Sequence, residues 1–219
     1  MNTAAAIAGI AVIITMNGDV KIQEAGTTQW YPAEAGMSVS DGDTIRTGKG
    51  ASLELSMDDG DNVIVSLYEN STAIMRGSSL SRIDLPEGRI RSYVKKLNKG
   101  SSFEIKTPTV IAGARGSSWD VEASGAGFST VEAFEDVIFV KSVDEKGNIV
   151  EEKDLQQDYS IKVDKNRRFG AVSKIKASDK EAWKKWKAKK RVPRNSIKKK
   201  PRPAMNKPLK QNSAPRHKR

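Results

Sequence analysis

Apolar and polar residues alternate along most of the first three quarters of the chain. Between residues 51 and 58, apolar side chains occupy every second position, with Ser, Glu or Asp between them. This period of two is typical of a β-strand with one buried face. Residues 58–62, DDGDN, predict a turn, and Val63, Val65 and Leu67 continue the same face on a partner strand.

Further segments have the composition of short strands, and turn residues separate them. These segments are residues 76–85, 88–96, 101–107, 117–124, 127–134, 136–143 and 159–165. The turn residues are Gly88, Gly100, Gly125, Gly127 and residues 144–148. Closely spaced strands without helical patterns between them predict an all-β domain, a compact antiparallel-rich sandwich or barrel-like structure.

The N-terminal residues allow two interpretations. Residues 4–14 form an apolar run of signal-peptide length, but the first cation of the chain, Lys21, comes after it. The run is too short to cross a bilayer as a helix. Its second half also fits a strand, because Asn17-Gly18 is typical of a type I′ hairpin turn. Residues 1–14 are therefore either a signal remnant or part of a first strand.

One helix is expected, at residues 178–191. Ser178 and Glu181 have the spacing of a capping box, and the segment ends before a proline. Trp183 and Trp186 form a narrow apolar stripe among lysines. Three interpretations remain open: docking of both Trp rings onto the β domain, contact with an anionic membrane or acidic partner, and stacking on nucleic-acid bases.

Charge divides the chain into two parts. Residues 174–219 carry 19 Lys/Arg and 2 Asp/Glu, a net charge of +17, whereas residues 1–173 carry 19 and 25, a net charge of −6. Five of the eight prolines also lie after residue 192. We therefore expect a β domain at residues 15–173, a basic amphipathic helix at 174–192 and a disordered Pro-rich tail at 193–219.

The basic segment supplies the residues expected to contact a partner or a polyanion. Lysine and arginine clusters bind polyanions largely by releasing counterions. The expected contact residues are Trp183, Lys184, Lys185, Trp186, Lys187, Lys189, Lys190, Arg191, Lys198, Lys199 and Lys200.

Catalytic chemistry has few candidates in this sequence. The chain has no cysteine, and its one histidine, His217, lies in the predicted tail. Asp58, Asp59 and Asp61 surround a glycine, but their spacing is not that of an EF-hand loop, and a turn favours the same residue types. Residues 113–118, GARGSS, lack the lysine of a phosphate-binding loop. We expect a protein that is not an enzyme and has neither a metal nor a cofactor.

Two motifs, in order, carry a resemblance to a known family. Residues 41–75 begin with DGDTIRTG, and residues 88–121 end with TPTVIAGARGSSWDV. Together they resemble the FecR domain, and the resemblance extends over residues 17–165. The sequence departs from the family pattern at Ser117, which replaces Thr, at Trp119, which replaces Phe, and at Asp136, where glycine is frequent.

The resemblance implies an all-β domain located in the cell envelope. In the best-known members it is the periplasmic part of a single-pass membrane regulator, which receives a signal from an outer-membrane transporter and controls a sigma factor. The chain shows no apolar run of spanning length and no second α/β subdomain after residue 165, so we expect a stand-alone FecR-like protein. We expect it to be periplasmic or otherwise exported, and cytoplasmic if Met1 is the true start.

The resemblance also marks a set of structural motif residues. They are Asp41, Gly42, Asp43, Thr47, Thr107, Pro108, Gly113, Arg115, Gly116 and Trp119. Arg115 has two interpretations: a partly buried architectural role, bonded to turn carbonyls or an acidic side chain, and contact with an anionic ligand or partner. The flanking glycines favour the architectural role, in which Arg115→Ala would destabilise the domain by about 3 kcal/mol or more.

The sequence thus predicts a non-enzymatic interaction or sensing module of the cell envelope. In this hypothesis the acidic β domain holds a protein partner, and the basic tail attaches to an anionic polymer or membrane face. The alternative is a nucleic-acid-associated protein that binds through the same tail.

Overall fold

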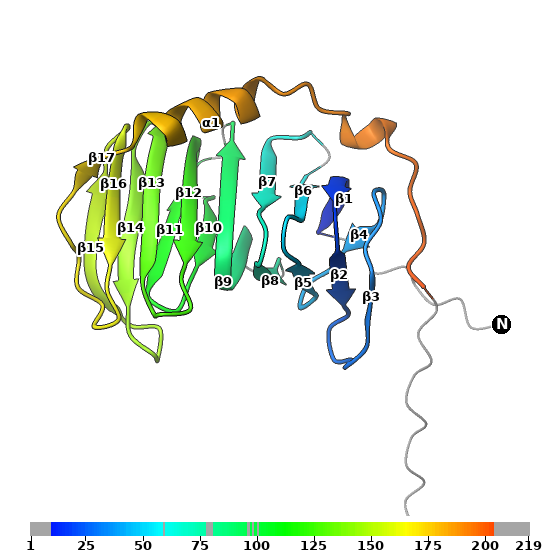
Figure 1. Cartoon of the computed structure of the whole chain (residues 1–219), viewed down its shortest axis with the longest axis horizontal. Coiled ribbons are helices and arrows are strands. Elements are labelled where there is room, and N and C mark those ends of the chain that lie inside the picture. Colours follow the sequence, from blue (N-terminus) through cyan, green and yellow to red (C-terminus); the bar gives the residue numbers. More distant parts are fainter. Residues whose placement is uncertain are drawn as a thin grey trace, which may run out of the picture.

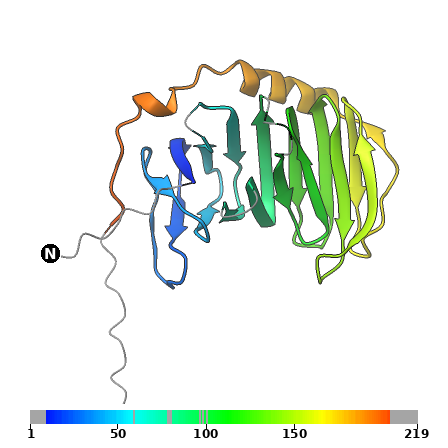
Figure 2. The same ribbon diagram turned by 180° about the vertical axis from the view of Figure 1, so that it is seen from behind.

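The computed structural model confirms the all-β class and shows two layers of strands that form an open sandwich and not a closed barrel (Figure 1). It describes residues 10–58, 60–77, 81–95, 97, 99 and 101–203. Figure 2 shows from behind that the basic C-terminal segment follows one side of the strands over most of the domain's length.

One layer, sheet A, has a linear strand order and antiparallel pairing throughout its described strands. In spatial order it contains β4 (Ser38–Val39), β1 (Ala11–Asn17), β6 (Ser52–Ser56), β7 (Val63–Leu67), β9 (Ser81–Val94), β12 (Ser117–Ala123), β13 (Ser129–Glu135), β16 (Tyr159–Val163) and β17 (Ser173–Lys174).

The other layer, sheet B, has a matching linear order. It contains β3 (Trp30–Pro32), β2 (Val20–Gln23), β5 (Thr44–Thr47), β8 (Thr72–Arg76), β9, β10 (Phe103–Lys106), β11 (Val110–Ala114), β14 (Ile138–Val143) and β15 (Ile149–Leu155). Its strands pair antiparallel, except that β9 and β10 are parallel.

Strand β9 belongs to both sheets, and it joins the strands predicted at residues 76–85 and 88–96 into one. Its first half pairs with β8 in sheet B, and its second half pairs with β12 in sheet A. Gly88 lies at the change of sheet with a φ of +101°, and a Cβ there would approach the Ser71 hydroxyl oxygen to 2.1 Å. Only glycine fits, because other residues would clash and rarely adopt this φ.

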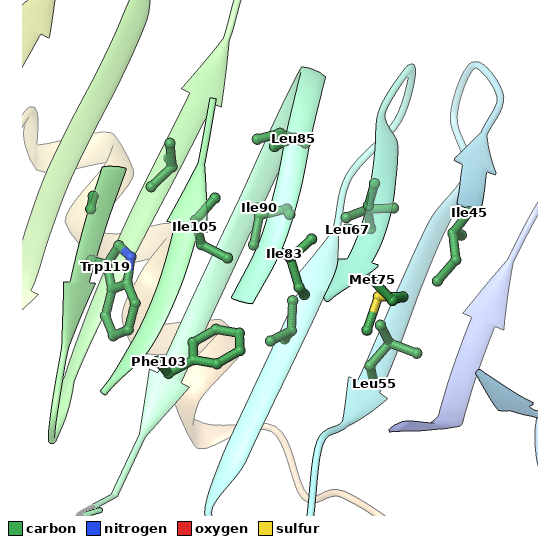
Figure 3. Packing of buried hydrophobic residues seen from close by; sticks show 14 of the residues in the cluster. Ile45, Leu55, Leu67, Met75, Ile83, Leu85, Ile90, Phe103, Ile105 and Trp119 are labelled. Atoms are coloured by element: carbon green, nitrogen blue, oxygen red, sulfur yellow. The ribbon is translucent and has the colours of Figure 1, made fainter. Parts of the chain in front are cut away.

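The hydrophobic core fills the space between the two sheets. Figure 3 shows side chains of both sheets meeting there, among them Ile83 from the first half of β9 and Ile90 from the second. Phe103 and Trp119 are fully buried in the same core, with ring centroids 6.1 Å apart. Burial of each large apolar side chain contributes about 1.5–3 kcal/mol, so this core is the main source of stability.

The Asn17-Gly18 turn does not form the predicted hairpin. Strand β1 pairs with β6 in sheet A, whereas β2 pairs with β5 in sheet B, so the turn carries the chain from one sheet to the other. The hairpin prediction was wrong because both strands bury side chains in the core between the sheets. Residues 11–14 are buried in β1, and residues 1–9 of the predicted 1–14 segment lie outside the described residues.

Strand β15 was not predicted from the sequence. Six of its seven residues are exposed, including Ile149 and Val150. A strand that is open to solvent on both faces has no alternation of apolar and polar residues, so its pattern resembles that of a loop.

The predicted helix is present as α1, Ala177–Ala188, and a 3-10 turn, η1, follows at Arg194–Ser196. The predicted capping box is wrong, because Ser178 lies inside the helix and the N-cap residue is Lys176, whose side chain makes no cap hydrogen bond. Within the described ranges, no helix has the length and apolar character needed to cross a membrane.

Candidate interaction site

Residues 176–203, here called the strap, lie across the outer face of sheet A. In Figure 1 this segment, coloured orange, runs from the β17 side of the domain to the β1 and β4 side. Its helix contacts β7 through Ser66 and β13 through Glu135, and its later residues contact β6 through Ser56. The segment expected to meet a partner is therefore held against its own domain.

Two tryptophans dock the helix onto the sheet. The Trp183 ring stacks on Phe134, with centroids 5.5 Å apart and an interplanar angle of 6°. The Trp186 indole N–H donates to the Ser66 hydroxyl oxygen at 2.8 Å, and the Arg191 guanidinium lies 4.3 Å from its ring centroid. Of the three interpretations of this helix, the structure shows the docking of both Trp rings.

A buried ion pair lies beneath the helix. Arg91 donates from Nε and Nη2 to the two carboxylate oxygens of Asp120, at 2.7 and 2.8 Å. Both side chains are almost fully buried, at 2% and 3% exposure. Arg89 also donates to Asp120, at 2.5 Å from Nη2. The bidentate geometry is the strong form of this interaction, and it holds the Arg91 guanidinium plane in place.

The Arg91 guanidinium is surrounded by aromatic rings. Its central carbon lies 5.1 Å from the Phe134 centroid and 5.6 Å from the centroids of Tyr68 and Trp186. Cation–π contacts of this kind favour a desolvated cation. Arg91 therefore links the strand residues below it to the tryptophan of the strap above it.

Glu132 lies at the edge of this cluster and has a perturbed acidity. Burial raises the pKa of Glu132 from its ordinary value of 4.5 to about 7. The Asp120 and Asp179 carboxylates add to the rise, whereas Arg89 and Arg91 oppose it. Near neutral pH this carboxyl is therefore only partly ionised beneath the helix.

Acidic residues of sheet A and its loops hold the cations of the strap. Lys187 pairs with Glu135, Lys189 and Arg191 approach Glu54 at 3.6 and 3.5 Å, and Lys180 pairs with Asp158 at 2.8 Å. Beyond the helix, Lys200 pairs with Glu34.

The far end of the strap is anchored by Arg202. Its guanidinium donates to the Ser38 carbonyl at 2.8 Å, to the Ser40 hydroxyl at 2.9 Å and to the Asp43 carboxylate at 2.6 Å. Asp43 is 1% exposed and also accepts from the backbone N–H groups of Ala25 and Ser40. The aspartate of the first motif thus orders its own turn and receives the strap.

The other residues of the first motif order neighbouring turns. Asp41 accepts from the backbone N–H of Gly77 at 2.9 Å, and Gly42 has a φ of +80°. The Thr47 hydroxyl is buried, donates to the Tyr68 carbonyl at 2.5 Å and accepts from the backbone N–H of Ser71 at 2.9 Å. These residues therefore have a structural role in the turns next to β5.

The second motif is also structural, except at its arginine. The Thr107 hydroxyl accepts from two backbone N–H groups of its turn, whereas Pro108 is exposed. A Cβ on Gly113 would lie 2.5 Å from the Phe103 carbonyl oxygen, so β10 and β11 approach closely there. Trp119 is fully buried in the core.

The architectural interpretation of Arg115 is wrong. Arg115 is exposed, and the described part of the structure gives its side chain no hydrogen bond or ion pair. It borders a shallow hollow of about 420 Å³ with Lys95, Leu97, Gly116 and Asp136. Asp136 has a φ of +46°, so it adopts the left-handed conformation that glycine would supply.

The buried arginine of this domain is Arg91, which sequence reasoning missed. The glycines beside Arg115 suggested close packing, but β11 and β12 join there in an exposed turn. A signal for Arg91 existed, because it alternates with the apolar Ile90 on one strand and Asp120 alternates with Trp119 on another. The sequence alone did not show that these strands, β9 and β12, are neighbours in sheet A.

The strap changes the extent of the predicted tail. Residues 193–203, assigned to a disordered segment, are placed along the domain because Arg202 and Lys200 find acidic partners. Residues 204–219 lie outside the described residues. The lysines of the strap that are exposed without a described ion pair are Lys176 at its start and Lys185, Lys190, Lys198 and Lys199 further along, whereas Lys184 pairs with Glu181 of its own helix.

The aspartates at residues 58–62 serve the turn between β6 and β7. The Asp58 carboxylate accepts from the Asn62 backbone N–H at 2.7 Å, and Asp61 has a φ of +50°. Asp59 lies outside the described residues. Across the residues that are placed, His, Cys, Asp and Glu side chains form no cluster of three or more that could hold a metal ion.

The fold and the site define a two-layer β domain that carries a basic strap on an acidic face. Residues 43–138 match the model of a family described as FecR protein, which confirms the resemblance for that part of the predicted range 17–165. Two crystal structures of a "putative anti-sigma factor" from Parabacteroides distasonis have TM-scores of 0.53 to this chain, at 18% and 17% identity. Each match covers 64% of this chain and 63% of the other. No curated protein matches the sequence.

Removal of Asp120 is expected to be far more destabilising than removal of the exposed Arg115. Asp120→Ala leaves Arg91 buried without its carboxylate, which should lower the free energy of unfolding by about 3–5 kcal/mol. Arg115→Ala should change it by about 0.5 kcal/mol or less. Urea denaturation of both full-length variants checks this, and an equal loss of stability in the two would contradict the assignment.

Glu132 predicts a pH dependence of stability. The folded protein keeps the Glu132 proton up to a pH of about 7, whereas the unfolded chain loses it near the ordinary pKa, so stability falls as pH rises through this window. Glu132→Gln should remove this part of the slope, about 2 kcal/mol or less. Urea midpoints at several pH values between about 5 and 8 compare the two proteins, and parallel curves would refute the prediction.

Proposed function

We propose that this chain is a non-enzymatic interaction and signalling module of the cell envelope. The FecR match at residues 43–138 supports a regulatory role. The fold shared with a protein described as an anti-sigma factor supports a protein partner in signalling. In this proposal the protein is periplasmic or otherwise exported, as the FecR resemblance implies.

The strap carries the attachment part of the proposal, because it has two charged sides. Its inward cations pair with acidic residues of the domain, as Lys187 does with Glu135. Its outward lysines, Lys185, Lys190, Lys198 and Lys199, are exposed. A cation near an anionic lipid surface contributes about 1 kcal/mol, so four of them give a weak and reversible attachment.

Attachment to an anionic surface of the envelope is favoured over nucleic-acid binding by the position of the two tryptophans. Trp183 is stacked on Phe134, and Trp186 is bonded to Ser66. Bases therefore find no free aromatic platform on the docked strap, whereas phosphate-bearing surfaces need only the outward lysines. This two-sided arrangement of the strap is the observation that carries the proposal.

Fractionation of cells that produce the native protein tests both parts together. The native protein should be found in the envelope and should sediment with membranes at low salt. A full-length variant with Lys185, Lys190, Lys198 and Lys199 changed to Gln should remain in the envelope compartment but lose most of its sedimentation with membranes. Recovery of the native protein only from the cytoplasm, or its release by nuclease treatment, would defeat the proposal.

A further inference from the structure

The strap covers a face of sheet A that has the chemistry of a binding groove. This covered face, which we call the groove, consists of Glu54, Ser66, Arg91, Asp120, Phe134 and Glu135, and the strap contacts it through Trp183, Trp186, Lys187 and Arg191. We infer that this groove is the site for the protein partner, that it accepts a cationic helix bearing two aromatic residues, and that the strap is a resident occupant which the partner displaces. This inference rests on the proposed function, because it names the surface and the partner chemistry of that interaction.

The groove is organised by strand residues and not by the strap. The bidentate Arg91–Asp120 pair joins β9 to β12, and Arg89 supports the same carboxylate from β9. Phe134 is 2% exposed and presents its ring to the stacked indole above it. A site whose polar groups are already fixed loses little conformational entropy on binding, so the groove is suited to a second ligand of the same chemistry.

Charge complementarity identifies that ligand. Glu54, Asp120 and Glu135 carry more charge than Arg89 and Arg91 can neutralise, and the excess is acidic. Lys187, Lys189 and Arg191 of the strap pair with these acidic side chains. A partner segment would need the same spacing, with a helix that bears aromatic residues at i and i+3 and a cation at i+4, followed by an extended stretch with cations at i+6 and i+8.

The strap is attached more weakly than an element of the core. No residue of α1 is fully buried, although its two tryptophans are half-buried, and its N-cap residue makes no side-chain hydrogen bond. Buried nitrogen atoms of Trp183 and Arg191 have no hydrogen-bond partner in the described structure. The Lys180–Asp158 and Lys187–Glu135 pairs are partly open to solvent, and surface ion pairs of this kind are worth about 0–1 kcal/mol each.

Displacement of the strap would leave the hydrophobic core complete. The core cluster ends at Val163, and the partly buried residues packed against it end at Phe169. The strap residues therefore add contacts on the outer face only. A tethered segment acts at an effective concentration of about a millimolar, so a partner must bind the groove more tightly than the strap does.

A peptide with the sequence of residues 176–203, labelled with a fluorophore, provides the probe. Fluorescence anisotropy should show that it binds full-length Trp183→Ser/Trp186→Ser protein at least tenfold more tightly than wild type, because the weakened strap vacates the groove. Adding Glu54→Gln and Glu135→Gln to that variant should weaken binding at least tenfold. A peptide carrying the same two Trp→Ser changes is the control and should bind neither protein. Equal affinity of the peptide for the variant and wild type would overturn the inference.

Thiol labelling tests strap opening in a protein with both tryptophans. The chain has no cysteine, so Ser66→Cys places a single thiol beneath Trp186 and Ser142→Cys places one in a fully buried position on β14. The Ser66→Cys thiol should react at least tenfold faster and should speed up further with added KCl, which screens the ion pairs. Equal rates for both thiols, set by global unfolding, would overturn the inference.

These results are independent of the compartment. A cytoplasmic native protein with a competent groove would defeat the proposed envelope function and leave the groove assignment standing. An exported protein whose vacated groove does not bind the peptide would overturn the groove assignment and leave the proposed envelope function standing.

Discussion

Strand β9 imposes the constraint on which the rest of the structure depends, because one strand serves both sheets. Once Gly88 has carried it into sheet A, Ile90 lies in the core and Arg91 must point to the outer face. The register sets Asp120 of β12 directly opposite Arg91. The core packing and the buried ion pair therefore follow from the same strand crossing.

The ion pair also explains why a very basic segment lies on this domain. A guanidinium fixed by Asp120 and enclosed by Phe134 and Tyr68 leaves one open side, which Trp186 covers. Around it, acidic side chains such as Glu135 pair with lysines of the strap. The chain thus neutralises part of its own charge, and the outward lysines leave part of the positive charge of the strap exposed to solvent.

The alternation of apolar and polar residues predicted strands well where one face of the strand is buried. It failed where the structure depends on which segments pair with one another. Alternation located most strands, but it could not show that β1 and β2 enter different sheets. Flanking glycines made Arg115 seem the buried arginine, whereas burial of Arg91 depends on a helix far along the chain. Charge composition separated the basic segment correctly but could not reveal that the acidic domain holds it.

Amide hydrogen exchange on the full-length protein tests the central claim, that the strap opens while the β domain stays folded. The account predicts that amides of α1 exchange through a low-energy opening, with protection at least a hundredfold below that of β9 and β12, and that this protection falls with added salt. Protection of α1 equal to that of β9 would show that the strap and the domain unfold together, and would contradict it.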